Sequence, residues 1–129
     1  MSKYLADTTV VVAMLRGDER TRRFLEDLPE ISAVTVVELI QGCESRNDLR
    51  VVEKTCTLLP QVRIDLNISS FAIELLKKYY LSHNLLFLDA LVAASAILRK
   101  KILVTANIKD FRFINGLEVM SHDQAFGKQ

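Results

Sequence analysis

The sequence is poor in the residues that mark several classes of protein. Its 129 residues include 2 Cys, 2 Pro, 4 Gly and no Trp. The two cysteines lie outside any CxxC pair or Cys/His cluster, which excludes a disulfide-rich secreted domain and argues against structural zinc. The scattered glycines and prolines form no linker, repeat or low-complexity run. We therefore expect one domain that spans residues 1–129, with both thiols reduced.

Net charge is nearly absent as well. The 17 Lys and Arg residues against 16 Asp and Glu residues leave +1, which excludes a protein held on nucleic acid by bulk charge alone. Intrinsic disorder is excluded too, because 50% of the chain is hydrophobic. Local basic clusters at 20–23 and 99–101 remain as candidate contacts with phosphate, and we interpret the second as the solvated end of a helix.

Long apolar runs are also missing. The chain begins MSKYLAD, without the apolar core of a signal peptide. The longest apolar stretch, 85–98, is interrupted by Asp89 and Ser95, so it does not have the pattern of a membrane span. We therefore expect a cytoplasmic protein that does not contact a membrane.

The sequence does contain a regular alternation of short apolar segments and helical patterns. The stripe of Phe71, Leu75, Leu76 and Tyr79 has helical spacing and belongs to the core or to a dimer interface. The apolar segments show almost no polar alternation, which is typical of a parallel sheet covered on both faces. We predict an α/β fold, a three-layer α/β/α sandwich with a central, mainly parallel sheet of about five strands. Strands are predicted at 4–6, 31–34, 62–64, 102–104 and 117–120, and helices at 8–15, 19–28, 35–41, 48–59, 68–79 and 88–99.

Acidic residues gather at one predicted edge of this sheet. Asp7 follows the first strand, and Glu38 lies one turn into the helix after the second. Asp110 follows the fourth strand, and Asp89 opens the buried helix 88–99, whose first turn can reach the same place. Since ligands of open parallel sheets bind beyond the carboxyl ends of the strands, these four carboxylates are candidates for one shared pocket.

Helix capping is the competing explanation for each acid. Asp7 stands at the N-cap position of helix 8–15, and Thr35 with Glu38 has the spacing of a capping box. Asp89 in a first turn suits the helix dipole, and segment 107–110 resembles a looser capping arrangement. On this interpretation the chain is a non-catalytic α/β interaction module.

Capping does not explain why all of these positions carry a carboxylate. Asn and Ser cap about as well as Asp, whereas four carboxylates in one pocket repel each other unless a cation compensates them. Mg²⁺ or Mn²⁺ prefers oxygen ligands and supports phosphodiester hydrolysis. The Thr9 hydroxyl can face a metal-bound water or a phosphate, with an ordinary first-turn helix role as the alternative. Thr105 and Asn107 can contact phosphate or steer Asp110, with ordinary turn roles as the alternative.

At these positions the sequence resembles the PIN-domain nucleases, in particular the VapC-like toxins of bacterial and archaeal toxin-antitoxin systems. Four segments carry the resemblance in the family's order: YLADTTV at 4–10, VTVVELIQG at 34–42, LDALVAASA at 88–96 and VTANIKDF at 104–111. One such motif alone is a weak signal, but four in order across nearly the whole chain are specific. The resemblance implies a PIN-like version of the predicted sandwich.

The resemblance also implies a divalent-metal-dependent endoribonuclease that hydrolyses RNA phosphodiester bonds and acts as the toxin of a toxin-antitoxin pair. Asp7, Glu38, Asp89 and Asp110 are then the catalytic acidic set. Asp7 and Asp89 are the expected Mg²⁺ (or Mn²⁺) ligands, while Glu38 and Asp110 contact the ion indirectly or hold a second one. A cognate antitoxin in a groove near the active site and a homodimer are further implications.

Three positions depart slightly from the family pattern. Thr9 replaces a commoner Ser and keeps the hydroxyl, and Asn84 stands where Gly is frequent but tolerates the same left-handed backbone. Ala106 stands where relatives often carry Arg, a change expected to affect RNA or partner contacts more than metal binding. His83 and His122 have no partner motif, so neither is assigned a catalytic role.

A phosphoaspartate receiver domain is a third alternative, because it also places acids at the edge of a parallel sheet. Receivers pair adjacent acids near the first strand, whereas Asp7 has Ala6 and Thr8 beside it. The metal-dependent nuclease is therefore the preferred prediction.

Overall fold

The computed structural model describes residues 2–126, so residue 1 and residues 127–129 of the predicted domain lie outside the described residues. Five strands are present: β1 (Tyr4–Ala6), β2 (Glu30–Ser32), β3 (Gln61–Val62), β4 (Ile102–Thr105) and β5 (Val119–Ser121). The helices are α1 (Thr8–Leu15), α2 (Glu19–Glu26), α3 (Ala33–Gln41), α4 (Arg46–Leu58), α5 (Leu66–His83), α6 (Phe87–Leu98), the 3₁₀ helix η1 (Ile108–Asp110) and α7 (His122–Phe126).

All strand pairs are parallel, and the strands lie in the order β3-β2-β1-β4-β5. The chain builds β1, β2 and β3 outward in one direction, then returns through α5 and α6 to place β4 on the other side of β1. The strand order therefore reverses between β1 and β4. In open parallel sheets, the carboxyl ends of the strands at such a reversal form a binding crevice.

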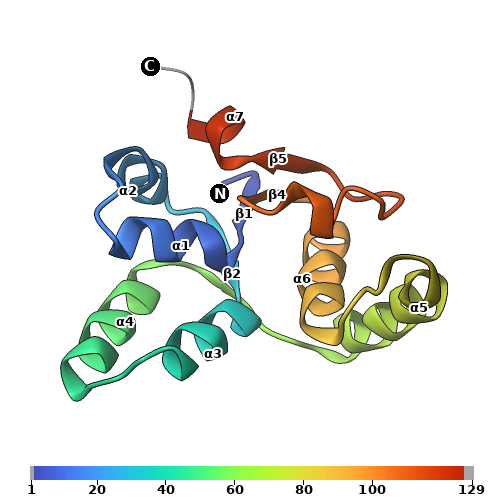
Figure 1. Cartoon of the computed structure of the whole chain (residues 1–129), viewed down its shortest axis with the longest axis horizontal. Coiled ribbons are helices and arrows are strands. Elements are labelled where there is room, and N and C mark those ends of the chain that lie inside the picture. The colour runs from blue at the N-terminus through green and yellow to red at the C-terminus, as the bar shows by residue number, and fades with distance from the viewer. Residues whose placement is uncertain (1, 127–129) are drawn as a thin grey trace.

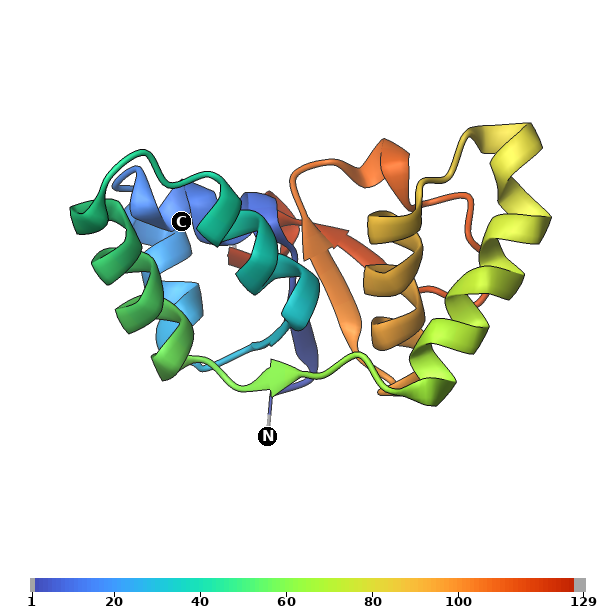
Figure 2. The same cartoon turned by 90° about the horizontal axis from the view of Figure 1, so that it is seen from below.

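The sheet separates two hydrophobic cores because successive strand residues point to opposite faces. Leu5 and Leu103 pack with residues of α5 and α6, whereas Ala6 and Val104 pack with residues of α1, α2 and α4. Figures 1 and 2 show these two groups of helices on opposite sides of the strands. The predicted three-layer α/β/α sandwich is confirmed.

Helix α5 packs its predicted apolar stripe into the first of these cores. Leu75 and Tyr79 are buried, and Phe71 and Leu76 are partly buried against the same cluster. The core interpretation of this stripe is therefore correct. The helix ends at His83, and its C-cap Asn84 adopts the left-handed conformation, with φ 55°, that Asn is predicted to tolerate.

A buried carboxylate marks the amino end of the sheet. Glu30 begins β2 and is 3% exposed. Its carboxylate lies 2.7 Å from Lys101 Nζ and 3.4 Å from an Arg99 guanidinium nitrogen. The interpretation of 99–101 as a solvated cluster is thus wrong for Lys101, whose side chain is only 11% exposed. These cations neutralise a carboxylate of the protein and lie far from the carboxyl ends of the strands.

Two composition-based predictions can be compared with the described residues. Cys43 and Cys56 are both free, as expected for reduced thiols. Within residues 2–126, no helix has both the length and the apolar character needed to cross a bilayer.

Candidate active site

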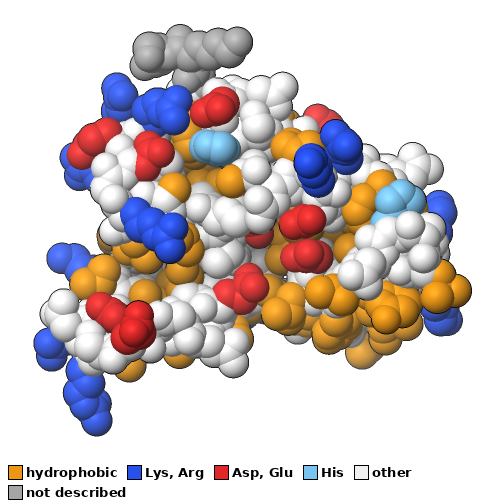
Figure 3. Space-filling view, in the orientation of Figure 1, with side chains coloured by type: hydrophobic (Ala, Val, Ile, Leu, Met, Phe, Trp, Pro, Cys, Tyr) orange, Lys and Arg blue, Asp and Glu red, His pale blue; other side chains and the backbone are white. Residues whose placement is uncertain are grey.

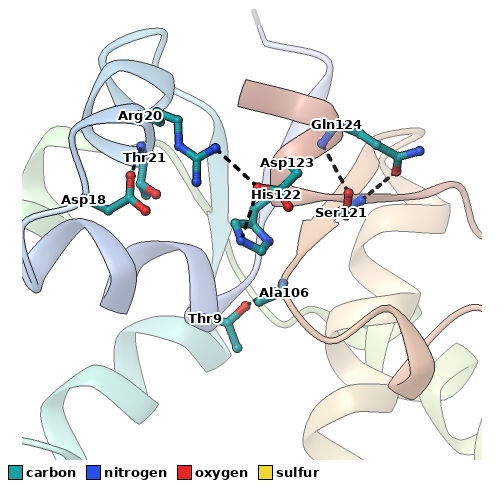
Figure 4. A network of polar contacts seen from close by, with 9 residues as sticks. All are labelled: Thr9, Asp18, Arg20, Thr21, Ala106, Ser121, His122, Asp123 and Gln124. Atoms are coloured by element: carbon teal, nitrogen blue, oxygen red, sulfur yellow. Dashed lines mark hydrogen bonds and ion pairs between the residues drawn. The ribbon is translucent and has the colours of Figure 1, made fainter. Parts of the chain in front are cut away.

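Asp7 lies at the carboxyl end of β1, beside the reversal of strand order. Its Oδ2 atom accepts hydrogen bonds from the hydroxyls of Thr105 (2.8 Å) and Thr9 (3.1 Å). Each hydroxyl oxygen in turn accepts a backbone N–H, from Asn107 at 3.0 Å and from Ala106 at 3.1 Å. The contact between Ala106 and Thr9 is drawn in Figure 4. Two backbone amides thus orient two hydroxyl protons toward one carboxylate oxygen.

Glu38 reaches the same edge from the middle of α3. Its Oε1 atom lies 2.6 Å from the hydroxyl of Thr8, the first residue of α1. That hydroxyl also lies 2.9 Å from the hydroxyl of Thr35, which is fully buried one turn before Glu38. A hydroxyl has one proton, so Thr8 serves one of these acceptors at a time. This contact ties the start of α1 to α3 on one side of Asp7.

Asp89 enters the site from the first turn of α6 and carries the most perturbed carboxyl. Its pKa is raised to about 6, mainly by burial and then by the negative charges of Asp7, Asp110 and Glu38. The other three acids that the sequence singled out therefore all lie close enough to Asp89 to act on it electrostatically. Red side chains near the middle of the face in Figure 3 mark this acidic region.

Asp110 and Asn107 lie on the more open side of the site. Asp110 is exposed at the end of η1, and Asn107 is exposed just before that helix begins. Asn107 acts on Asp7 only through its backbone N–H and the Thr105 hydroxyl. The site thus combines one buried carboxylate, two half-buried carboxylates and one exposed carboxylate.

The capping explanation does not account for these carboxylates. Asp7 occupies the N-cap position of α1 but makes no side-chain capping bond. The predicted capping box is wrong, because α3 begins at Ala33 and Ser32 caps it by accepting the N–H of Val34. Among the described residues, α6 and η1 have no side-chain cap either. By contrast, Asp18 and Asp65 do cap α2 and α5.

The family model of the PIN domain matches residues 4–116 of this chain. The chain belongs to the PIN-domain family. Ribonuclease VapC1 of Rickettsia felis is 30% identical to this PIN domain over 126 residues, which cover 91% of this chain and 94% of the relative. The predicted resemblance to VapC-like PIN-domain nucleases is thereby confirmed.

Solved structures share the fold of this PIN domain. A DNA-bound VapBC from Salmonella typhimurium matches with a TM-score of 0.83 and 24% identity, covering 95% of this chain and 99% of that chain. A toxin-antitoxin complex from Klebsiella pneumoniae matches with a TM-score of 0.77 and 24% identity, covering 92% and 97%. The strand order of the PIN domain also excludes the receiver alternative, since such domains have the order 2-1-3-4-5.

The donor chemistry of this PIN domain suits a hard divalent cation. Within residues 2–126, no group of three or more His, Cys, Asp or Glu side chains is arranged to hold a metal ion. Mg²⁺, however, is commonly held by one or two carboxylates, with water completing its coordination. Burial is the main cause of the raised pKa of Asp89, and the negative charges of Asp7, Asp110 and Glu38 add to it. A bound cation would offset both effects by favouring the charged form.

Sequence reasoning missed two residues of this site, Thr8 and Thr35. Neither was considered beyond helix structure, although Thr8 follows Asp7 directly and Thr35 lies one helical turn before Glu38. That turn spacing places Thr35 and Glu38 on one face of α3. What the sequence does not reveal is that Thr8, 30 residues from Glu38, donates across the gap between two helices.

Proposed function

We propose that this chain is a divalent-metal-dependent endoribonuclease that hydrolyses RNA phosphodiester bonds, with residues 1–129 forming one nuclease domain. The observation that carries the proposal is the hydrogen bonding of the Asp7 carboxylate. Two hydroxyls hold its Oδ2 atom, and no hydrogen bond from residues 2–126 reaches its Oδ1 atom. One oxygen is fixed while the other remains available to an ion, beside a second acid whose pKa is raised.

In this proposal Asp7 and Asp89 hold Mg²⁺ or Mn²⁺, and Glu38 and Asp110 contact it indirectly or hold a second ion. A bound ion of this kind supplies positive charge beside a phosphate and lowers the pKa of water. Thr9 and Thr105 orient the Asp7 carboxylate by donating to its Oδ2 atom. Asn107 supports Thr105 through its backbone N–H, and Asp110, being exposed, lies where an RNA strand enters.

Cleavage of RNA by the Asp7→Asn variant tests this proposal. Asn retains an oxygen that accepts from both hydroxyls, so we expect the thermal midpoint to stay within about 2 °C of wild type. Asn is a poor Mg²⁺ ligand, so we expect RNA cleavage to fall at least about 100-fold. The measurement is the rate at which a single-stranded RNA pool acquires new ends with Mg²⁺ or Mn²⁺, compared with EDTA.

Asp27→Asn is the matched control, because Asp27 is an exposed carboxylate at the end of α2. It should cleave like wild type. New RNA ends produced equally by wild type and Asp7→Asn would refute the assigned site. If the wild-type protein makes no new RNA ends even with Mn²⁺, the nuclease proposal is wrong, and the alternative of a non-catalytic interaction module is favoured.

An antitoxin partner is the second part of the proposal. The solved relatives include toxin-antitoxin complexes, and this chain carries an apolar groove of about 430 Å³ between α2 and α4. Its apolar lining suits an amphipathic segment of a partner protein. The groove is lined mainly by Met14, Leu25, Leu28, Leu58 and Leu59.

We also infer a homodimer, because α5 and the start of α6 expose large apolar side chains. Figure 3 shows hydrophobic side chains gathered on the side where α5 lies. Contiguous exposed apolar surface of this kind marks interaction sites. The residues concerned are Leu66, Ile73, Tyr80, Leu81, Leu86, Phe87 and Leu88.

A cytoplasmic location completes the proposal. Cys43 and Cys56 are free, and thiols persist in a reducing compartment.

A further inference from the structure

A groove leaves the acidic site along α1. Its volume is about 640 Å³, within the range of about 300–1,000 Å³ that is typical of ligand sites. Thr9 and Ala106 line one end, and Val12 and Ala13 line its length. Arg16 lines the other end together with Asp18. The groove therefore has an apolar middle, hydroxyl and backbone groups at the site, and a cation at its far end beside a carboxylate that already caps α2.

The groove is continuous with the acidic site through Thr9. The Thr9 hydroxyl donates to Asp7 and accepts from the backbone N–H of Ala106, so it belongs to both. Figure 4 shows Thr9 and Ala106 facing each other across this junction. Ala106 is exposed and contributes only a methyl group, which leaves the passage open.

Arg16 differs from nearby arginines in having no ion-pair partner among the described residues. It is exposed, and none of the ion pairs among residues 2–126 includes it, whereas Arg20 pairs with Asp123 and Arg22 with Glu19. The nearby carboxylate of Asp18 accepts the N–H at position 21 as the N-cap of α2. The Arg16 guanidinium can therefore bind an anion without breaking a pair within the protein.

We propose that this groove is a subsite for single-stranded RNA next to the cleaved bond, with Arg16 as its phosphate-binding residue. This inference rests on the proposed ribonuclease function. Arg16 stands seven residues beyond Thr9, about 10 Å along α1, so it meets a phosphate a few nucleotides from the acidic site. Among the described residues that line the groove there is no aromatic ring, so the subsite holds the backbone and has little base preference.

Binding of a fluorescent single-stranded RNA of about 12 nucleotides and mixed sequence tests the subsite. Anisotropy is measured in EDTA, which prevents metal-dependent cleavage, over a range of salt concentrations. Losing one phosphate contact lowers the slope of log affinity against log salt by about 0.7, which is about a fivefold loss of affinity at 0.1 M salt. We expect that change for Arg16→Gln and recovery of most of the affinity in Arg16→Lys.

Arg50→Gln is the matched control, since Arg50 is exposed on α4 and lies outside this groove. It should leave affinity and salt slope unchanged. Equal binding by wild type and Arg16→Gln, while wild type still cleaves RNA, would overturn the subsite alone. That result would favour a partner peptide as the occupant. Absence of both RNA binding and cleavage in wild type would overturn the subsite together with the proposed function.

Discussion

A buried carboxylate lies at each end of the sheet, and the two carboxylates have different partners. At the amino end, Glu30 is 3% exposed and is neutralised by Lys101 and Arg99. At the carboxyl end, Asp7 is 7% exposed, accepts two hydroxyl hydrogen bonds, and has three further acids around it. None of the ion pairs among residues 2–126 includes Asp7.

Glu30 is thus compensated by cations of the protein itself, whereas Asp7 is the carboxylate that we propose binds a cation from solution. Burying a charge is unfavourable unless it is paired, and the pairs around Glu30 meet that requirement within the protein. Around Asp7, neutral hydroxyls orient the charge without cancelling it. In the proposed function, a bound divalent cation supplies the compensating positive charge.

Breaking the ion pair between Lys101 and Glu30 at the amino end of the sheet should give the largest effect on stability. Lys101→Met removes the closer partner of Glu30 and leaves a buried carboxylate poorly compensated. We expect a loss of about 3 kcal/mol in the free energy of unfolding, measured by urea denaturation. RNA cleavage per folded molecule should not change, because this end of the sheet takes no part in the proposed site.

Two variants sharpen that result. Lys100→Met changes an exposed neighbour and should leave stability near wild type. Arg99→Gln should cost less than about 1 kcal/mol, because the Arg99 side chain is 48% exposed and solvent screens its ion pair. Equal losses in the three variants would show that Glu30 does not depend on Lys101.

Removing the negative charge of Asp89 at the carboxyl end of the sheet should change the free energy of unfolding less, and in the opposite direction. The folded state raises the pKa of Asp89 from 3.8 to about 6, so it binds the proton more tightly than the unfolded chain does. Stability is therefore lost as pH rises from about 4 to about 6, and stays lower above that range. Asp89→Asn removes this loss and should be more stable than wild type by about 1 kcal/mol at pH 7.5 in EDTA, the carboxyl being partly solvated.

The same urea experiment at pH 4.5 supplies the internal check. At this pH Asp89 is mostly protonated in the folded wild type, but the unfolded chain, with a pKa of 3.8, is already mostly ionised. The difference between the two proteins should therefore fall to about a third of its value at pH 7.5. Glu53→Gln, which changes an exposed acid on α4, should show no such pH dependence. A wild type that is more stable than Asp89→Asn at pH 7.5 in EDTA would contradict the assignment.

Local patterns predicted most of the fold, but they placed several boundaries a few residues away, that of α3 among them, and they did not predict η1 or α7. Apolar runs identified the five strands, and the scarcity of polar residues in them indicated the parallel sheet. Val34 continues the apolar run that includes Ile31, so apolar periodicity predicts a longer second strand and a start of α3 at Thr35. The hydroxyl of Ser32 decides the boundary by capping the helix, a contact that competes with apolar periodicity as a signal.

The site was predictable only to the extent that its residues follow strand ends. Asp7 directly follows β1, and Thr105 is the last residue of the neighbouring strand β4. The topology of the sheet therefore brings these two residues together. The contact between Thr8 and Glu38 depends instead on how α1 packs beside α3. The pairing of Lys101 with Glu30 likewise depends on the registers of β2 and β4 against β1, which composition and local periodicity do not encode.

The most direct test of the account is an NMR titration of the Asp89 side-chain carboxyl, with and without Mg²⁺. Without the ion, the account predicts a pKa of about 6, because burial and three neighbouring negative charges oppose ionisation. With saturating Mg²⁺ the pKa should fall below about 4, since the ion favours the charged form. A pKa near 4 that does not respond to Mg²⁺ would contradict the claim that the carboxyl end of the sheet is a cation site.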